Sequence, residues 1–135
     1  TEETKDGCEG FGRVGMLPEQ MTLRECGDFV KKALALHDVR VYGDPDRLVQ
    51  KAAVCTGSGK SMIPDALAKG AQVYVTGDID HHTGIDAVAS GLPIIDAGHY
   101  GTEYIFMKAM RKILEEKYPS LQITCAKVKS PYMIL

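Results

Sequence analysis

The sequence places a histidine and a glutamate four residues apart, in the segment DAGHYGTEYIF at residues 96–106. Residues four apart on a helix are neighbours, so the imidazole of His99 and the carboxylate of Glu103 would lie side by side. A nitrogen and an oxygen ligand presented together suit a divalent metal such as zinc, manganese or iron. The two side chains could instead only hydrogen-bond each other or the backbone, and both interpretations stay open.

The segment after His99 has the apolar spacing of a helix. At about 100° per residue, three apolar residues share the face of His99 and Glu103: Phe106, Met110 and Ile113. This pattern predicts that His99 and Glu103 face inward. Burying polar side chains without partners is costly, so both would need partners.

A second polar turn, GDIDHHTGIDA at residues 77–87, adds further candidates. Asp78 has two interpretations, as a residue of the site or as the N-cap of the helix that follows. His81 and His82 are adjacent and so point in different directions, which leaves room for one of them in a site. Asp96 lies three residues before His99 and could orient the imidazole ring without itself binding the metal.

The segment CTGSGKS at residues 55–61 resembles a phosphate-binding loop, because glycine amides before a helix suit anions. The nucleoside-triphosphate motif would require glycine at position 54, where Val54 stands. The sequence therefore predicts only a tight turn at Gly57, Ser58 and Gly59, with weak affinity for anions.

Strands and helices alternate along the chain, which predicts an α/β fold with a mixed, largely parallel sheet flanked by helices. The expected strands are 38–42, 48–55, 72–76, 93–97 and 121–128, and the expected helices are 23–36, 61–70, 82–90 and 99–117. Three successive strands end in polar, glycine-containing turns. Ligands of open α/β sheets bind at the carboxyl ends of the strands, so the site is expected where these turns meet.

The chain divides into an N-terminal arm at 1–21, rich in charge, glycine and proline, and an α/β domain at 22–135. Thr22 and Glu25 form the pattern of a capping box, which marks the start of the first helix. The arm carries little apolar surface, so we expect it to pack poorly or to pack against another chain.

Composition narrows the function classes. The chain has 135 residues with 16 basic and 18 acidic side chains, a balance that predicts no nucleic-acid partner. No apolar run approaches the ~20 residues needed to span a bilayer, and no signal peptide is evident, so a cytoplasmic location is expected. The four cysteines form no C-x-x-C pair and are expected to be reduced and mostly buried.

Four ordered motifs give the chain a family resemblance: GFGRVG at 10–15, KAAVCTGSGKS at 51–61, VTGDIDHHTGIDA at 75–87 and IDAGHYGTE at 95–103. Together they resemble the C-terminal half of the NIF-three-like dinuclear metal-centre proteins, which are also called type 2 homologues of GTP cyclohydrolase I. The resemblance covers roughly residues 10 to 133.

The resemblance implies two related α/β halves, with two divalent metal ions in the cleft between them, assembled into a toroidal hexamer. It implies that His99 and Glu103 are metal ligands and that His82 lines the cleft. The remaining ligands of the family belong to an N-terminal half, so the site would be completed by that missing half or by another chain.

Two functions follow as expectations. The first is a metal-dependent hydrolase acting on a small polar or nucleotide-like substrate, with His82 as a proton carrier. The second is a non-catalytic metal-binding protein that regulates or stabilises an assembly. Because this chain holds only part of the site, we expect it to be inactive alone and to bind metal weakly.

Overall fold

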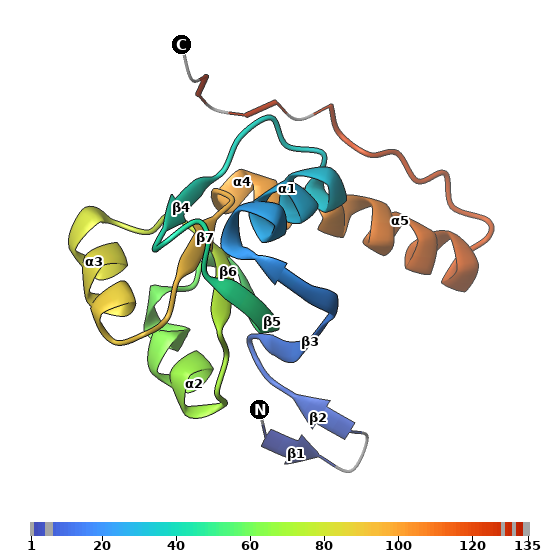
Figure 1. Ribbon diagram of the computed structural model, residues 1–135. Helices are drawn as coiled ribbons and strands as arrows, with labels where there is room; N and C mark the ends of the chain where they lie inside the picture. The colour runs from blue at the N-terminus through green and yellow to red at the C-terminus, as the bar shows by residue number, and fades with distance from the viewer. Residues whose placement is uncertain (1, 5–6, 128, 131, 134–135) are drawn as a thin grey trace.

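A five-stranded sheet forms the centre of the protein, which is described by a computed structural model covering residues 2–4, 7–127, 129–130 and 132–133 (Figure 1). Its strands, in spatial order, are β3 (Arg13–Thr22), β5 (Leu48–Ser58), β6 (Val73–Gly77), β7 (Ile94–Asp96) and β4 (Arg40–Tyr42). The three middle strands are parallel, and the two edge strands run antiparallel to them. The predicted mixed sheet with a parallel centre is confirmed.

The helices lie on both faces and at one end of this sheet. They are α1 (Leu23–Leu34), the 3-10 turn η1 (Lys60–Met62), α2 (Ile63–Ala68), α3 (His81–Ala89), α4 (His99–Glu103) and α5 (Ile105–Lys117). A small hairpin of β1 (Glu2–Thr4) and β2 (Gly7–Glu9) precedes β3. Figure 1 shows this hairpin below the sheet and α5 extending away from it.

Alternation along the buried strands divides the core into two layers, because successive side chains of a strand point to opposite faces. Val73 and Val75 of β6 pack in a cluster with Cys26 of α1. Tyr74, between them, packs in a second cluster with Ala87 of α3. Both faces of the parallel centre are therefore covered, which is why every residue of β6 is buried.

The capping box at the start of α1 is confirmed. The Thr22 hydroxyl accepts a hydrogen bond from the Glu25 amide at 3.2 Å, and the Glu25 carboxylate accepts one from the Thr22 amide at 2.8 Å. Residues 13–21, expected in the arm, instead belong to β3. This strand pairs with β5 through its backbone while its side chains, apart from Met21, stay largely exposed. An apolar pattern therefore could not reveal it.

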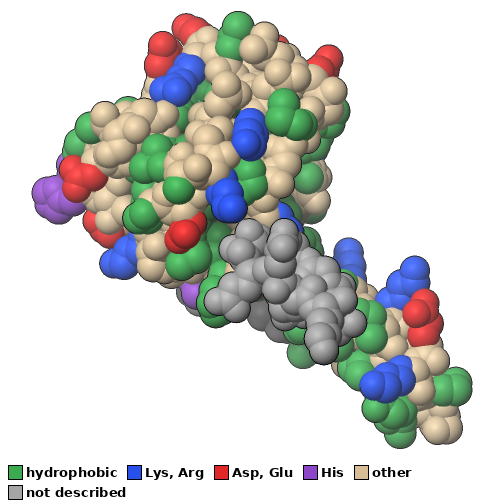
Figure 2. Space-filling view, turned by 90° about the horizontal axis from the view of Figure 1, so that it is seen from below, with side chains coloured by type: hydrophobic (Ala, Val, Ile, Leu, Met, Phe, Trp, Pro, Cys, Tyr) green, Lys and Arg blue, Asp and Glu red, His purple; other side chains and the backbone are tan. Residues whose placement is uncertain are grey.

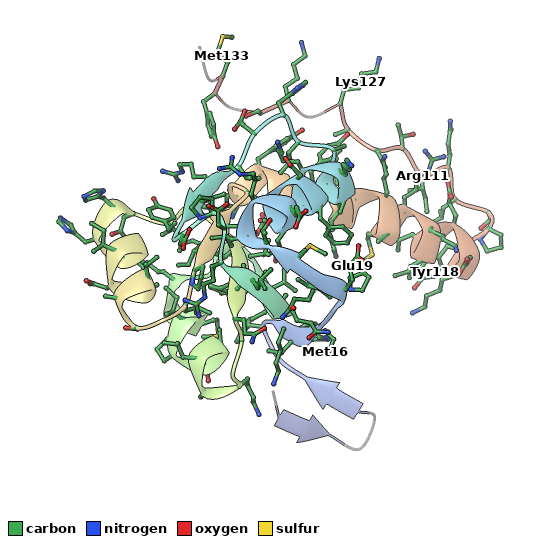
Figure 3. All side chains as sticks on the ribbon, viewed as in Figure 1. Met16, Glu19, Arg111, Tyr118, Lys127 and Met133 are labelled. Carbon is green, nitrogen blue, oxygen red and sulfur yellow. The ribbon has the colours of Figure 1, made fainter. Side chains whose placement is uncertain are left out.

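Of the two elements predicted for the C-terminal part, the helix is confirmed and the strand prediction is wrong over the described residues. The helix expected at 99–117 forms as α4 and α5, and Tyr104 between them has a helical φ of −54° and ψ of −33°. The strand expected at 121–128 does not form over residues 121–127, and residue 128 lies outside the described chain. None of the thirteen residues of α5 is buried. Figure 2 shows this end projecting from the body, and Figure 3 shows Arg111 and Tyr118 standing away from the sheet.

Two further sequence predictions concern thiols and the membrane. Cys26 and Cys55 are buried free thiols, as expected, whereas Cys125 is half-buried. Within the described ranges, no helix is long and apolar enough to cross a membrane.

Candidate metal-binding site

The carboxyl ends of the three parallel strands meet on one rim of the sheet, as predicted. Ser58 of β5 is paired with Gly77 of β6, and Thr76 of β6 with Asp96 of β7. The chain leaves each strand close to this rim, and α4 begins there at His99. The rim therefore gathers residues that lie more than forty positions apart in the sequence.

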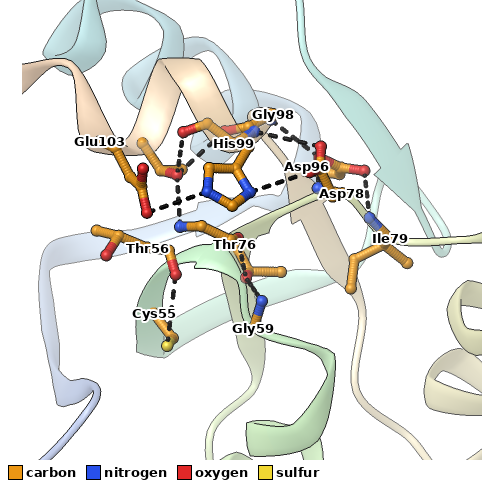
Figure 4. Close-up of polar contacts among 12 residues, drawn as sticks. Cys55, Thr56, Gly59, Thr76, Asp78, Ile79, Asp96, Gly98, His99 and Glu103 are labelled. Atoms are coloured by element: carbon orange, nitrogen blue, oxygen red, sulfur yellow. Dashed lines mark hydrogen bonds and ion pairs between the residues drawn. The ribbon is translucent and has the colours of Figure 1, made fainter.

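His99 lies between two carboxylates, one from each of two different elements (Figure 4). Its Nδ1 is 3.1 Å from Oδ2 of Asp78, in the turn after β6, and its Nε2 is 3.2 Å from Oε1 of Glu103, one helical turn along α4. We call Asp78, His99 and Glu103 the His99 cluster. Each carboxylate faces a different ring nitrogen, so the imidazole separates the two acids.

The prediction that His99 and Glu103 face inward is wrong. Their side chains are 50% and 51% exposed, and Phe106 on the same stripe is 59% exposed. The face of α4 that packs on the sheet instead carries Gly101 and Thr102. The helical wheel treated 99–117 as one helix lying on the core, whereas only the short α4 packs there. The His99 cluster is consequently open to a ligand.

The absence of a side chain at Gly57 leaves room for the side chains of His99 and Glu103. A Cβ atom at this position would lie 2.7 Å from Oε1 of Glu103 and 3.3 Å from Nε2 of His99. Gly57 also has a φ of +65°, a left-handed conformation that favours glycine. It lies inside β5, where the pairing with β6 is irregular, and not in a turn after the strand as predicted.

Two buried threonines, which the sequence analysis did not single out, fix this irregular segment. The Gly57 amide donates to Oγ1 of Thr102 at 2.9 Å, and the Gly59 amide donates to Oγ1 of Thr76 at 3.1 Å. Both amides, expected to contribute to a weak anion site with Ser58, are thus used within the chain. The signal available in the sequence was a hydroxyl at the end of the otherwise apolar strand VYVT.

Asp78 takes the role expected of Asp96, and of its own two predicted roles it has the one in the site. Asp78, and not Asp96, contacts the His99 ring. The carboxylate of Asp96 is buried and points instead to backbone amides of the turns around it. Its position at the end of β7 directs it into the sheet edge, whereas the left-handed backbone of Asp78, with a φ of +55°, turns its side chain toward α4.

The N-cap of α3 is Asp80, not Asp78. Oδ1 of Asp80 accepts from the Thr83 amide at 3.0 Å, and Oδ2 accepts from the Thr83 hydroxyl at 2.7 Å. These two hydrogen bonds lower the pKa of Asp80 to about 2. Asp78 is therefore released from capping and available to His99.

His82 lies on α3 and its ring packs edge-on against that of His81, with 5.4 Å between ring centroids. No contact among the described residues joins His82 to the His99 cluster. The structure therefore does not bring together the two histidines that the sequence analysis placed in one cleft.

A hollow of about 380 Å³ lies beside the His99 cluster and shares Asp78 with it. Its lining consists of Asp38, Arg40, Asp78, Asp96, Ala97, Gly98 and Tyr132. No group of three or more His, Cys, Asp or Glu side chains among the described residues is arranged to hold a metal ion. The pair His99 and Glu103 would therefore need further ligands from outside this part of the chain.

Known proteins resemble this chain in both sequence and fold. The chain is 45% identical over 105 residues to a protein of Bacillus subtilis named GTP cyclohydrolase 1 type 2 homolog, covering 78% of this chain and 28% of that protein. A protein of the same name from Listeria innocua is 41% identical over 117 residues, covering 87% of this chain and 31% of that protein. The chain thus spans less than a third of the length of these relatives.

Solved structures of other proteins have the same fold as this chain. A Bacillus cereus protein related to NIF3 matches with a TM-score of 0.81 and 35% identity, over 93% of this chain and 36% of that one. A hypothetical protein of Staphylococcus aureus matches with a TM-score of 0.87 and 28% identity, over 93% of this chain and 43% of that one. The family model described as Duf34/NIF3 (NGG1p interacting factor 3) matches residues 1–131. The chain belongs to the Duf34/NIF3 family.

Proposed function

We propose that this chain supplies two ligands, Nε2 of His99 and Oε1 of Glu103, to a divalent-metal site of a hydrolase. The observation that carries the proposal is the 3.2 Å separation of these two atoms on an exposed rim. Two ligand atoms about 2.1 Å from a zinc ion at a tetrahedral angle lie roughly 3.4 Å apart. The pair thus has the spacing of two neighbouring ligands of one ion.

Asp78 supports this role from the other side of the ring. Its carboxylate faces Nδ1 of His99, which leaves Nε2 directed at Glu103. Histidines that bind metals usually make such a contact through their second nitrogen, because it fixes the tautomer and the direction of the ring.

The reaction proposed is the hydrolysis of a small polar or nucleotide-like substrate. A bound divalent ion supplies Lewis acidity, which suits such a hydrolysis. The hollow of about 380 Å³ beside Asp78 is within the range of small-molecule sites. It offers the guanidinium of Arg40 and several carboxylates to polar groups. The relatives' name adds the suggestion of a nucleotide. No proton transfer is assigned to His82, because its ring contacts His81 instead of the His99 cluster.

The complete site would hold two ions, with the remaining ligands supplied by another segment or another chain. Catalytic zinc sites usually take three protein ligands. A chain that offers two should therefore hold metal weakly when alone. The greater length of the relatives is consistent with a second part that completes the site.

Metal titration tests this proposal. We would titrate Mn²⁺ and Zn²⁺ by calorimetry into the 135-residue chain and into a chimaera in which it replaces the matching segment of the Bacillus subtilis relative. The chimaera should bind tightly and the chain weakly. In the chimaera, His99→Ala and Glu103→Gln should each reduce affinity by more than the ~10–100-fold typical of residues behind the ligands.

His81→Ala is the matched control, since it removes an exposed histidine that has no contact with the His99 cluster. Its affinity should equal that of the unmodified chimaera. Equal tight binding by chain and chimaera, or unchanged binding after His99→Ala, would refute the assignment.

A non-catalytic role in an assembly is the second candidate, and the exposed α5 favours it. This helix carries exposed apolar side chains, including Ile105, Phe106 and Ile113, with no buried residue. Hydrolysis assays of the metal-loaded chimaera with nucleotides separate the two functions. No turnover, together with metal-dependent assembly measured by analytical ultracentrifugation, would favour the assembly role.

A further inference from the structure

A single buried carboxylate joins the two turns that carry the His99 cluster. Asp96 is 2% exposed, at the carboxyl end of β7. Its Oδ1 accepts from the amides of Asp78 at 3.1 Å and Gly98 at 2.9 Å. Its Oδ2 accepts from the Ile79 amide at 3.0 Å and from the guanidinium of Arg40. Four donors thus compensate the cost of burying this charge.

The two donors on Oδ1 flank the contact between Asp78 and His99. Asp78 has a left-handed backbone, and its carboxylate lies 3.1 Å from Nδ1 of His99. Gly98, with a φ of +71°, immediately precedes His99 and is the N-cap residue of α4. Each end of the contact is therefore anchored, through one peptide group, to the same oxygen atom.

We propose that Asp96 is the positioning residue of this site, acting on His99 only through Asp78 and Gly98. It holds the β6–α3 and β7–α4 turns at the spacing that directs Asp78 to Nδ1 and so aims Nε2 toward Glu103. This inference rests on the proposed function, because the positioning serves metal binding by His99 and Glu103. The geometry that it describes can be measured without any metal.

The ion pair with Arg40 offers a different explanation for Asp96, and the structure separates the two. Arg40 contacts Oδ2, whereas Oδ1 joins the turns. The Arg40 side chain is 63% exposed, so it can turn to solvent if it loses Asp96. Replacing Arg40 removes the ion pair and keeps the link between the turns, which makes Arg40→Gln the matched control.

The experiment is a double-mutant cycle. Asp96→Ala removes both oxygens, where asparagine would keep one acceptor. Asp78→Gly removes the carboxylate and tolerates the left-handed backbone. Nitrogen-resolved NMR of the metal-free 135-residue chain reports the proton shared between Nδ1 of His99 and Asp78. Asp96→Ala should abolish this signal as fully as Asp78→Gly does, while Arg40→Gln retains it.

Metal affinity of the chimaera gives the second readout. Asp96→Ala and Asp78→Gly should each lower Mn²⁺ affinity ~10–100-fold, and the double variant should be no weaker than the weaker single variant. The proposal would be overturned if the losses of affinity in the two single variants multiplied in the double variant, or if Arg40→Gln lost as much affinity as Asp96→Ala. It would also be overturned if the NMR signal of the Nδ1 proton were unchanged in Asp96→Ala. Absence of metal binding by the unmodified chimaera would count against the proposed function alone, because the NMR readout still decides the positioning.

If Asp96→Ala does not fold, amide exchange in the unmodified chain decides instead. The amides of Asp78 and Gly98 should exchange slowly, because each donates to Oδ1 of Asp96. Fast exchange of either amide in a folded chain would contradict the proposed link.

Discussion

A Cβ atom at Gly57 would lie 2.7 Å from Oε1 of Glu103. We therefore expect Gly57→Ala to push the Glu103 carboxylate away from Nε2 of His99, since the end of a glutamate side chain moves more easily than the backbone of β5. The left-handed φ of +65° adds a cost of about 1–2 kcal/mol to the folded state. Affinity of the chimaera for Mn²⁺ should fall about 10-fold, comparable to substitutions that reorient a ligand.

Gly91→Ala is the matched control for this variant. Gly91 has a φ of +89°, but an added Cβ would meet nothing within 4 Å. Both variants should lose similar stability in urea denaturation, and only Gly57→Ala should lose metal affinity. An equal loss of affinity in both would attribute the effect to backbone strain, not to Glu103.

Thr102 offers a test of the buried hydroxyls. Thr102→Val keeps the shape of the side chain but leaves the buried Gly57 amide without its acceptor. This should lower the free energy of unfolding by about 1–3 kcal/mol. Thr56→Val makes the same chemical change at an exposed position of β5 and should stay within about 0.5 kcal/mol of the unmodified chain. Equal midpoints of urea denaturation for the two variants would show that this hydrogen bond does not stabilise the fold.

The sheet and the rim that carries the candidate site could be predicted because their signals are local. The strands β5, β6 and β7 each contain an apolar run followed by a glycine, and the carboxyl ends of parallel strands must meet. The capping box of Thr22 and Glu25 likewise needs only four consecutive residues. The candidate pair His99 and Glu103 was found for the same reason.

The environment of that pair could not be predicted, because it depends on long-range placement. Apolar spacing predicts that one face of a helix will be buried, but it does not identify the surface that buries it. In α5 no residue is fully buried, and Met107, Met110 and Leu114 are only partly buried. The contact between Asp78 and His99 depends on a left-handed residue and spans 21 positions. The strand β3 pairs by backbone hydrogen bonds, which leave little trace in side-chain pattern.

Amide exchange should distinguish α5 from α1 in the isolated chain. The two helices have 13 and 12 residues, but α1 buries Leu23, Cys26, Gly27 and Val30 while α5 buries none. A helix of this length is marginal in water without packing. We expect α5 amides to exchange at least ~100-fold faster than those of α1 at low protein concentration. Protection of α5 equal to that of α1 would mean that another surface covers it.

The buried thiol of Cys26 predicts a specific loss of stability at alkaline pH. Burial raises its pKa from 9.0 to about 11, so between these values the unfolded chain releases a proton that the folded chain keeps. Its stabilising contribution is complete below pH 9 and is lost as pH rises toward 11. The free energy of unfolding of the native chain, relative to Cys26→Ala, should fall by on the order of 2 kcal/mol over this range. Parallel curves for the two proteins would show that the thiol ionises equally in both states.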